Sequence, residues 1–526
     1  MTHNDPPRLS RLKAPWEVRR DSPTVRANSA SITLMLPLLL LIATIFAILA
    51  SSSATEINEK ILWGSIGLSA YLASLFTFLF SKLRYFGLFE VQLGAWFLAY
   101  AILAFGVSTL TIMQPQIGTA AMVDKTKVPT ALLLIGLSFT LWSFGYVVGR
   151  ARIFQTPFRW GNATLMSGLS NEFRRPSTLL LTFACGIAAD FLMVFVGGQY
   201  GYLGNSLVAT VDSVAWYTQP LVIVSSLKFA AVFGLAARVF IGRTDSFVRY
   251  VLPTLAFTVA IGLLTGMKES FLIAFVSVGV PYLLGSSRWR LLPMIGVVLV
   301  FVFFVTPTIS GLRQDVRGGS GSLDVVSALN LGVNKIFSGN YLVENNSPQN
   351  SVSTMERIRL IDNLALIITK SPDQIPYRSL GEVVSAPVTG FVPRLVWPDK
   401  PVRLSGYEFY RIYYEGTSYS SSAITLQGSL YLYGGLWVLL VGMLIVGLAT
   451  RALDEALDVK NNLHGALFLV LVLSVIVKQE MDAASFLSAV PSFIISWVLG
   501  AHLIFERSHP KQPANERRGA PSRRAQ

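Results

Sequence analysis

The chain has 526 residues, of which 52% are hydrophobic and only 14% are charged, and its mean hydropathy is +0.54. A soluble protein of this length has no core large enough to hide so much apolar surface, so the composition excludes an ordinary globular enzyme. The net charge of +14 would allow nucleic-acid binding, but the basic residues lie mainly beside predicted helix ends and in the terminal segments. Anionic lipid headgroups explain that distribution more simply, and no nucleic-acid-binding module is recognisable.

Apolar stretches recur along the chain at lengths that suit a helix crossing ~30 Å of hydrocarbon. About twelve are predicted, with cores at residues 32–50, 61–80, 92–112, 128–148, 177–196, 219–239, 248–264, 269–284, 291–308, 430–448, 463–477 and 486–504. The first has no small-residue cleavage site, so we expect a retained helix instead of a signal peptide. The sequence therefore predicts an all-α polytopic membrane protein.

Lysine and arginine residues predict the orientation of these helices. If the N terminus lies inside and the helices alternate, more than half of the 43 Lys and Arg residues fall in inside segments. The short outside connections then carry almost none, and one long segment is exempt because large loops translocate regardless of charge. We expect a multi-pass protein of the cytoplasmic (inner) membrane with both termini inside. Its predicted parts are a basic arm (1–31), a membrane domain (32–308), a large extracytoplasmic loop (309–427), a second membrane domain (428–505) and a basic cytoplasmic tail (506–526).

The predicted loop is far longer than a typical connection, which favours a functional role. Residues 352–370 place apolar side chains on one helical face, so we expect an amphipathic helix that lies on the membrane surface or caps the bundle. Residues 390–401 fit neither helical nor strand periodicity, and their prolines predict a rigid extended path. That path would hold several candidate site residues in place, namely Arg394, Trp397, Asp399, Lys400 and Arg403.

Common catalytic motifs are absent from the sequence, including the Walker A loop, His-Glu-x-x-His, Asp-x-Asp and Gly-x-Ser-x-Gly. We therefore expect no metal site and no cofactor. All four histidines lie near predicted cytoplasmic ends, so the base of an outside reaction would be a carboxylate or a neutralised lysine. The single cysteine, Cys185, lies in an apolar stretch and is expected to be a packed thiol.

Charged residues converge on the predicted outer face. One short turn carries Lys268 and Glu269, a second carries Lys478, Glu480 and Asp482, and the large loop adds further cations, including Arg313 and Arg317. Guanidinium and ammonium groups gathered at headgroup depth suit a phosphate or pyrophosphate, which indicates a lipid-linked substrate. Ordinary solvated turn charges are the alternative interpretation.

Two charges lie deeper, Asp190 and Lys228, in consecutive predicted helices. A charge within a membrane is costly unless it is paired or functional. A structural ion pair and a substrate contact both remain open.

Three segments resemble one family. Residues 391–401 read Phe-Val-Pro-Arg-Leu-Val-Trp-Pro-Asp-Lys-Pro, which resembles the Pro-Arg-x-x-Trp-Pro-x-Lys-Pro signature of Wzy-type oligosaccharide repeat-unit polymerases, the O-antigen and exopolysaccharide polymerase family. Residues 266–269 (Gly-Met-Lys-Glu) resemble that superfamily's short outer turn, and residues 427–435 resemble its junction between large loop and helix. The chain departs from many members at Ser429, near which they carry an acidic residue.

The resemblance implies a metal-independent membrane glycosyltransferase on a glycosyltransferase-C-like scaffold, acting on undecaprenyl-pyrophosphate-linked glycan at the outer face. A chain-length regulator and a flippase are the implied partner proteins. In this interpretation Lys268, Arg313, Arg317, Arg394 and Lys400 hold the pyrophosphate, and Glu269 or Asp399 deprotonates the acceptor. Trp397, Tyr407 and Tyr410 would stack on sugars, although Trp397 is equally well explained as a membrane-interface anchor. Arg403, Glu480, Lys228 and Asp190 are further candidates for substrate binding.

Two other functions fit the same pattern. An O-antigen-type ligase would share the scaffold and the cationic mouth. It is the second interpretation only because residues 397–401 resemble the polymerase signature. A polysaccharide flippase or transporter would account naturally for the helix number and for Asp190 and Lys228. The large loop, with its own expected helix, argues against a transporter.

Overall fold

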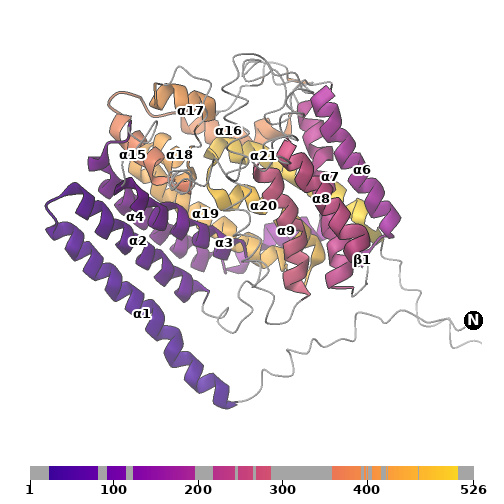
Figure 1. The fold of residues 1–526 in the computed structure, drawn as a ribbon, viewed down its shortest axis with the longest axis horizontal. Helices are drawn as coiled ribbons and strands as arrows, with labels where there is room; N and C mark the ends of the chain where they lie inside the picture. The colour runs from indigo at the N-terminus through magenta and orange to yellow at the C-terminus, as the bar shows by residue number, and fades with distance from the viewer. Residues whose placement is uncertain are drawn as a thin grey trace, which may run out of the picture.

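The structure, a computed structural model, is mostly helical (Figure 1). It describes residues 23–80, 92–113, 122–195, 217–242, 247–264, 268–285, 358–392, 396–397, 400, 406–415, 422, 424–459 and 461–507. Within these ranges, eight helices are long and apolar enough to cross a membrane, and three shorter apolar helices accompany them. The chain is therefore an all-α membrane protein in its main architecture.

The apolar stretches of the N-terminal half coincide with helices, apart from residues 291–308, which lie outside the described part of the chain. Two of these helices contain a π-helical turn, η3 and η7. The elements are α1 (Pro23–Ser53), α2 (Ile57–Leu79), α3 (Leu93–Ala101), η3 (Ile102–Gly106), η4 (Val107–Met113), η6 (Lys125–Lys127), α4 (Val128–Val148), α6 (Pro176–Phe195), α7 (Thr218–Phe240), η7 (Phe247–Val251), α8 (Leu252–Leu264) and α9 (Lys268–Leu284).

The stretch predicted as one helix at residues 430–448 is broken near its start. The short helix α18 (Leu426–Leu432) ends before Gly434, and α19 (Gly435–Leu457) begins with Gly435 at φ 66°. Glycine adopts this left-handed conformation without the steric penalty of a side chain, so the chain turns here. The last two apolar stretches form α20 (Leu463–Lys478) and α21 (Ala483–Ile504).

One end of the bundle carries elements that hydrophobic periodicity did not predict. Strand β1 (Leu169–Phe173) pairs antiparallel with β2 (Phe505–Arg507), and the amphipathic helix α5 (Arg152–Leu165) packs against α19. The ring of His464, at the start of α20, lies 3.1 Å from the carbonyl oxygen of Ser170. We call this the sheet end.

The opposite end, which we call the loop end, carries the helices of the large loop (Figure 1). They are α15 (Ile361–Lys370), α16 (Leu380–Phe391) and α17 (Gly406–Tyr413). Helix α15 packs against α4 and α18, with Ile361, Leu364 and Ala365 buried, so it caps the bundle and does not lie on the membrane surface. Helix α16 packs against α21 and includes Gly390 and Phe391, so the prediction of an extended path is wrong for these two residues.

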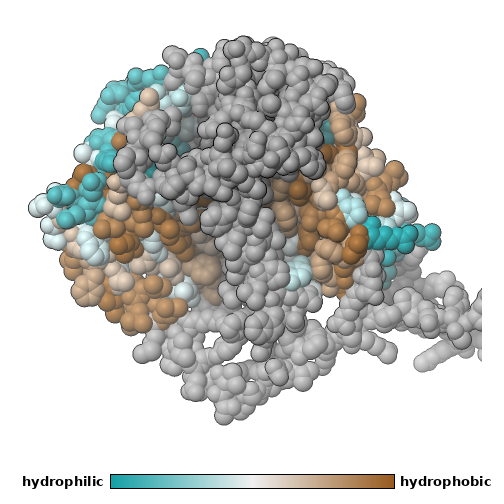
Figure 2. All heavy atoms as spheres, in the orientation of Figure 1, coloured by the Kyte–Doolittle hydropathy of each residue, from teal (hydrophilic) through white to brown (hydrophobic). Residues whose placement is uncertain are grey.

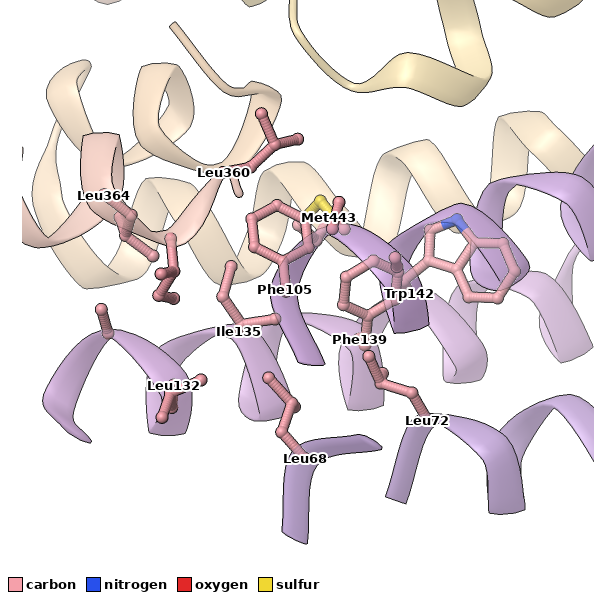
Figure 3. Close-up of a cluster of buried hydrophobic side chains, with 14 of the residues drawn as sticks. Leu68, Leu72, Phe105, Leu132, Ile135, Phe139, Trp142, Leu360, Leu364 and Met443 are labelled. Carbon is pink, nitrogen blue, oxygen red and sulfur yellow. The ribbon is translucent and has the colours of Figure 1, made fainter. Parts of the chain in front are cut away.

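The main core lies between the loop helices and the spanning helices. Figure 3 shows Phe105, Phe139 and Trp142 packed beneath Leu360 and Leu364 from the loop. A second core joins α7, α20 and α21. The flanks of the molecule are hydrophobic, as expected of surfaces that face lipid (Figure 2). Cys185 is exposed on α6, so the predicted packed thiol is wrong.

Glycines allow α4 and α19 to cross in close contact. A Cβ atom on Gly145 would lie 2.1 Å from the carbonyl oxygen of Leu444, and one on Gly447 would lie 2.0 Å from that of Trp142. Both obstacles are backbone atoms, which cannot move aside without separating the helices. Small residues at such crossings let membrane helices gain dispersion contacts that lipid cannot supply.

We expect Gly145→Ala and Gly447→Ala each to lower the thermal unfolding midpoint of the detergent-solubilised protein, by about 1–3 kcal/mol of overpacking. The matched control is Gly136→Ala on the same helix, where the nearest atom would lie at an ordinary 3.8 Å. Equal midpoints for all three variants would contradict the close crossing.

Candidate functional site

The structure describes the side chains of only some predicted site residues, namely Asp190, Lys228, Trp397, Lys400, Tyr410 and Glu480. Lys268 and Glu269 begin α9 and Tyr407 lies in α17, but their side chains lie outside the described part. Arg313, Arg317, Arg394, Asp399 and Arg403 lie outside the described residues altogether. Their grouping into one cationic mouth therefore stays a prediction.

At the loop end, α18 is bound to the turn between α20 and α21. Gln479, at φ 53°, accepts a 2.9 Å hydrogen bond from the Leu426 amide through its backbone carbonyl. The side-chain oxygen of Gln479 accepts a 2.7 Å hydrogen bond from the side-chain amide of Gln427. The side-chain amide of Gln479 donates to the backbone carbonyl of Phe97 at 2.9 Å. Gln427 and Gln479 are both buried. Two segments singled out separately in the sequence, residues 427–435 and 478–482, thus form one hydrogen-bonded junction.

Ser429 and Glu480 extend this junction. The Ser429 hydroxyl oxygen accepts from the backbone amide of Ala483 at 3.0 Å. Glu480 accepts from the hydroxyl of Tyr100 at 2.9 Å and keeps partial access to solvent. Glu480 therefore lies at the loop end, at the edge of the junction.

Asp482 is buried, with 2% of its surface exposed, although its turn predicted a solvated charge. One carboxylate oxygen accepts from the backbone amide of Ser485 at 2.9 Å and caps α21. The other lies next to the hydroxyl of Tyr433 without a regular hydrogen bond. Burial raises the pKa of Asp482, against the opposing effects of the cap, Tyr433 and Arg378. A buried carboxyl of this kind is typical of proton-transfer sites, though structural networks also produce one.

Arg378 pairs with two loop helices and acts electrostatically on Asp482. Its guanidinium lies 3.0 Å from the Glu382 carboxylate and 3.8 Å from that of Glu408. Burial alone would lower the pKa of Arg378, but the hydrogen bond and charge of Glu382, with smaller contributions from Tyr433 and Glu408, raise it. The result is a group of one cation and three carboxyl groups that joins α16, α17 and α21. We call these five residues (Arg378, Glu382, Glu408, Tyr433 and Asp482) the loop-end cluster.

The sequence analysis missed Arg378, Glu382, Glu408 and Tyr433. The signals available were the four-residue spacing of Arg378 and Glu382, typical of a helical ion pair, and Ser379, which caps α16. Neither distinguishes a functional group from a solvated turn.

Trp397, Lys400 and Tyr410 differ in their exposure and in their contacts. Trp397 is 38% exposed, which suits either a sugar contact or an interface anchor. The Lys400 amine donates to the carbonyl of Val392 at 3.1 Å, which holds it near the end of α16. Tyr410 is 8% exposed and its ring stacks on Tyr414 at 5.5 Å, so it belongs to the core of the loop and its predicted sugar-stacking role is wrong.

A buried ion pair at the start of α15 helps to fix this helix to the bundle. The guanidinium of Arg359 lies 2.7 Å from the carboxylate of Asp362 and also donates to the hydroxyl of Thr111 at 2.8 Å. Asn363 accepts from the hydroxyl of Tyr414 at 2.7 Å. The loop helices are therefore bound to the spanning helices by polar contacts as well as by apolar packing.

Asp190 and Lys228 form an ion pair between α6 and α7. The Lys228 amine lies 2.7 Å and 2.5 Å from the two carboxylate oxygens and 2.8 Å from the hydroxyl of Ser225, which itself donates to Asp190 at 2.5 Å. Asp190 is 2% and Lys228 1% exposed. Gly186 permits this approach, because a Cβ there would lie 2.6 Å from the backbone nitrogen of Lys228. The closed geometry favours the structural interpretation over a substrate contact.

Comparison with known proteins gives a family without an assigned activity. The family described as "Domain of unknown function (DUF8712)" matches residues 154–469. The chain belongs to this family. The DUF8712 match runs from α5 into α20 and so includes the ion pair and the loop helices, but it ends before Asp482. No solved structure matches the chain. In the described part, no group of three or more His, Cys, Asp or Glu residues could hold a metal ion.

Removing one member of the Asp190–Lys228 pair should destabilise the protein strongly. Lys228→Met leaves a buried carboxylate without its partner, and we expect a loss of roughly 3–5 kcal/mol, seen as a lower thermal unfolding midpoint in detergent. The double variant Asp190→Asn, Lys228→Met should recover most of that loss. Lys127→Met, at an exposed lysine, is the control. A neutral effect of Lys228→Met, or no recovery in the double variant, would contradict a structural pair.

The raised pKa of Asp482 predicts a pH dependence with a definite sign. Because the folded state binds this proton more tightly than the unfolded state, wild type should gain stability relative to Asp482→Asn as the pH falls from neutral, and lose that gain as the pH rises through the folded pKa. Asparagine retains the helix cap. Thermal unfolding of wild type and Asp482→Asn measures this difference in stability. The range of about pH 4–8 runs from the ordinary pKa of a carboxyl group to just above neutral.

Glu415→Gln gives a control of opposite sign. Lys370 lowers the pKa of Glu415, so the contribution of the Glu415 carboxylate to stability should weaken as the pH falls. A pH-independent difference between wild type and Asp482→Asn would show that Asp482 titrates like a solvated carboxyl.

Proposed function

We propose that this DUF8712 protein is an oligosaccharide repeat-unit polymerase, a metal-independent glycosyltransferase of the inner membrane with a glycosyltransferase-C-like scaffold of about twelve spans. One observation carries most weight: the loop helices pack into the loop end of the bundle, where the loop-end cluster contains the buried carboxyl of Asp482 and the half-buried carboxylates of Glu382 and Glu408. The segment that resembles the polymerase signature, residues 391–401, begins where α16 ends, at the opposite end of this helix from Glu382. A loop with only a linking role would not need such anchoring.

The proposal places the sheet end in the cytoplasm and the loop end outside. The positive-inside rule supports this orientation, because the sheet end includes the basic connection between α4 and α6 and the start of the basic tail. His464 and His502 lie toward the sheet end, so the proposed outer chemistry uses carboxylates.

In the proposed reaction, a hydroxyl of the incoming lipid-linked repeat unit attacks the anomeric carbon of the growing chain. A new glycosidic bond forms, and the bond to undecaprenyl pyrophosphate breaks, with its electron pair leaving on the pyrophosphate. Lys268, Arg313, Arg317, Arg394 and Lys400 would stabilise the departing charge. Glu269 or Asp399 would accept the hydroxyl proton.

Asp482 has a separate place in the proposal. Its neighbour Ala483 donates to Ser429, the position near which the resembling polymerases often carry an acid. Asp482 therefore supplies a carboxyl at the same junction, from the turn between α20 and α21 instead of from α18. Its carboxyl lies next to the hydroxyl of Tyr433, and burial raises its pKa.

The test is the chain length of cell-surface polysaccharide, read on a gel, in a strain that lacks the gene and is complemented at equal protein level. Wild type should restore long chains, and an Arg394→Ala, Lys268→Ala double variant should leave single repeat units, because the leaving pyrophosphate is no longer stabilised. Lys127→Ala changes an exposed cation at the loop end outside the proposed set and should restore long chains fully.

Other outcomes would assign other activities. Long chains that accumulate on undecaprenyl pyrophosphate would indicate a ligase, and repeat units trapped on the cytoplasmic side would indicate a flippase. Normal chain lengths in both Glu269→Gln and Asp399→Asn would exclude these two carboxylates as the base while leaving the polymerase assignment in place.

A further inference from the structure

Helix α5 has an apolar stripe that no described part of the chain covers. Ile153 is 74% and Trp160 71% exposed, and Pro157 lies between them on the same side of the helix. The helix is bound to the bundle through a different face, on which Gln155 is buried and Asn162 donates to the carbonyl of Ala456 on α19. The stripe is thus a separate surface and no part of the contact with α19.

The position of α5 follows from the helix before it. α4 is one of the candidate membrane spans and ends at Val148, and α5 begins at Arg152. Three connecting residues reach at most roughly 10 Å, so the first turn of α5 lies close to the membrane surface. Phe144 and Val147, near the end of α4, are also exposed, so the lipid-facing surface of the spanning helix leads directly to α5.

Charge on the neighbouring face indicates which surface the stripe meets. Arg152 and Arg159 lie one helical face away from the stripe, Arg150 precedes the helix, and all three are exposed. In the described residues of α5 itself no acidic side chain opposes them. Apolar side chains flanked by arginines are typical of helices that lie in the headgroup layer of a bilayer with anionic lipids.

We propose that α5 is an interfacial helix, with Ile153 and Trp160 inserted among acyl chains and its arginines on anionic headgroups. This inference is independent of the proposed polymerase activity. Because α5 also packs against α19, anchoring α5 in the membrane interface would help to fix the position of α19.

The experiment measures the accessibility of single spin labels on the full-length protein in vesicles of phosphatidylethanolamine and phosphatidylglycerol. Cys185→Ser removes the only native thiol. Ile153→Cys and Trp160→Cys place labels on the stripe, and Ala163→Cys places a control label on the exposed arginine side of the same helix. All three positions are exposed, so these substitutions remove little packing.

Labels at 153 and 160 should collide several-fold more often with oxygen, relative to a water-soluble nickel complex, than the label at 163. Equal ratios at all three positions would overturn the inference, because the stripe would then face water. Low accessibility to both reagents at 153 and 160 would also overturn it, because a protein surface, such as a second copy, would then cover the stripe.

Lipid composition tests the charge argument separately. Replacing phosphatidylglycerol with neutral phosphatidylcholine should raise the nickel accessibility of the labels at 153 and 160, since the arginines lose their counter-charge. Unchanged accessibility would overturn the preference for anionic lipid.

Discussion

Polar groups that leave water must be satisfied within the protein, and the fold of this chain depends on that constraint. Lys228 is matched to Asp190 and Ser225 between α6 and α7, with the charges held in a closed triad. Arg359 is matched to Asp362 and Thr111 where α15 enters the bundle. At the other end of the same core, Asp454 accepts the first backbone amides of α3 and the hydroxyl of Tyr146. Each arrangement joins different elements of the fold, so satisfying a charge also specifies which helices become neighbours.

The same constraint explains how much of the fold was predictable. A lipid-facing helix must be apolar over its whole length, so its sequence signal is strong and local, and the helices from α1 to α9, apart from α5, appear where they were predicted. The turn at Gly434 and Gly435 was missed because apolar residues continue through it. The β1–β2 pairing was missed because its strands are short and lie more than 300 residues apart in sequence. Helix α16 contains Pro387 and several small residues, so its helical state depends on packing against α21.

The candidate site was less predictable than the fold, for a related reason. Residue type and turn position identified Glu480 and Asp482 as outer charges, but burial depends on what the loop places above them. Asp482 is buried next to Tyr433, and this burial changes an expected solvated charge into a carboxyl with a raised pKa. Tyr410 shows the converse, since an aromatic residue in a polar loop proves to be core once α17 packs beside α15. Both outcomes depend on long-range contacts that a local pattern does not contain.

The anchoring of the loop has a consequence for specificity. Leu360 and Leu364 pack on Phe105 and Trp142 of the spanning helices, and the Leu360 amide donates to the carbonyl of Ala104 in η3 (Figure 3). A π-helical turn leaves backbone carbonyls free to accept such bonds, so η3 offers α15 a fixed point of attachment within a membrane helix. The described loop helices cannot move as a free flap without exposing these apolar contacts. In the proposed polymerase, discrimination between substrates would then come from side chains on a rigid support, with α16, α17 and α18 positioned before any ligand arrives.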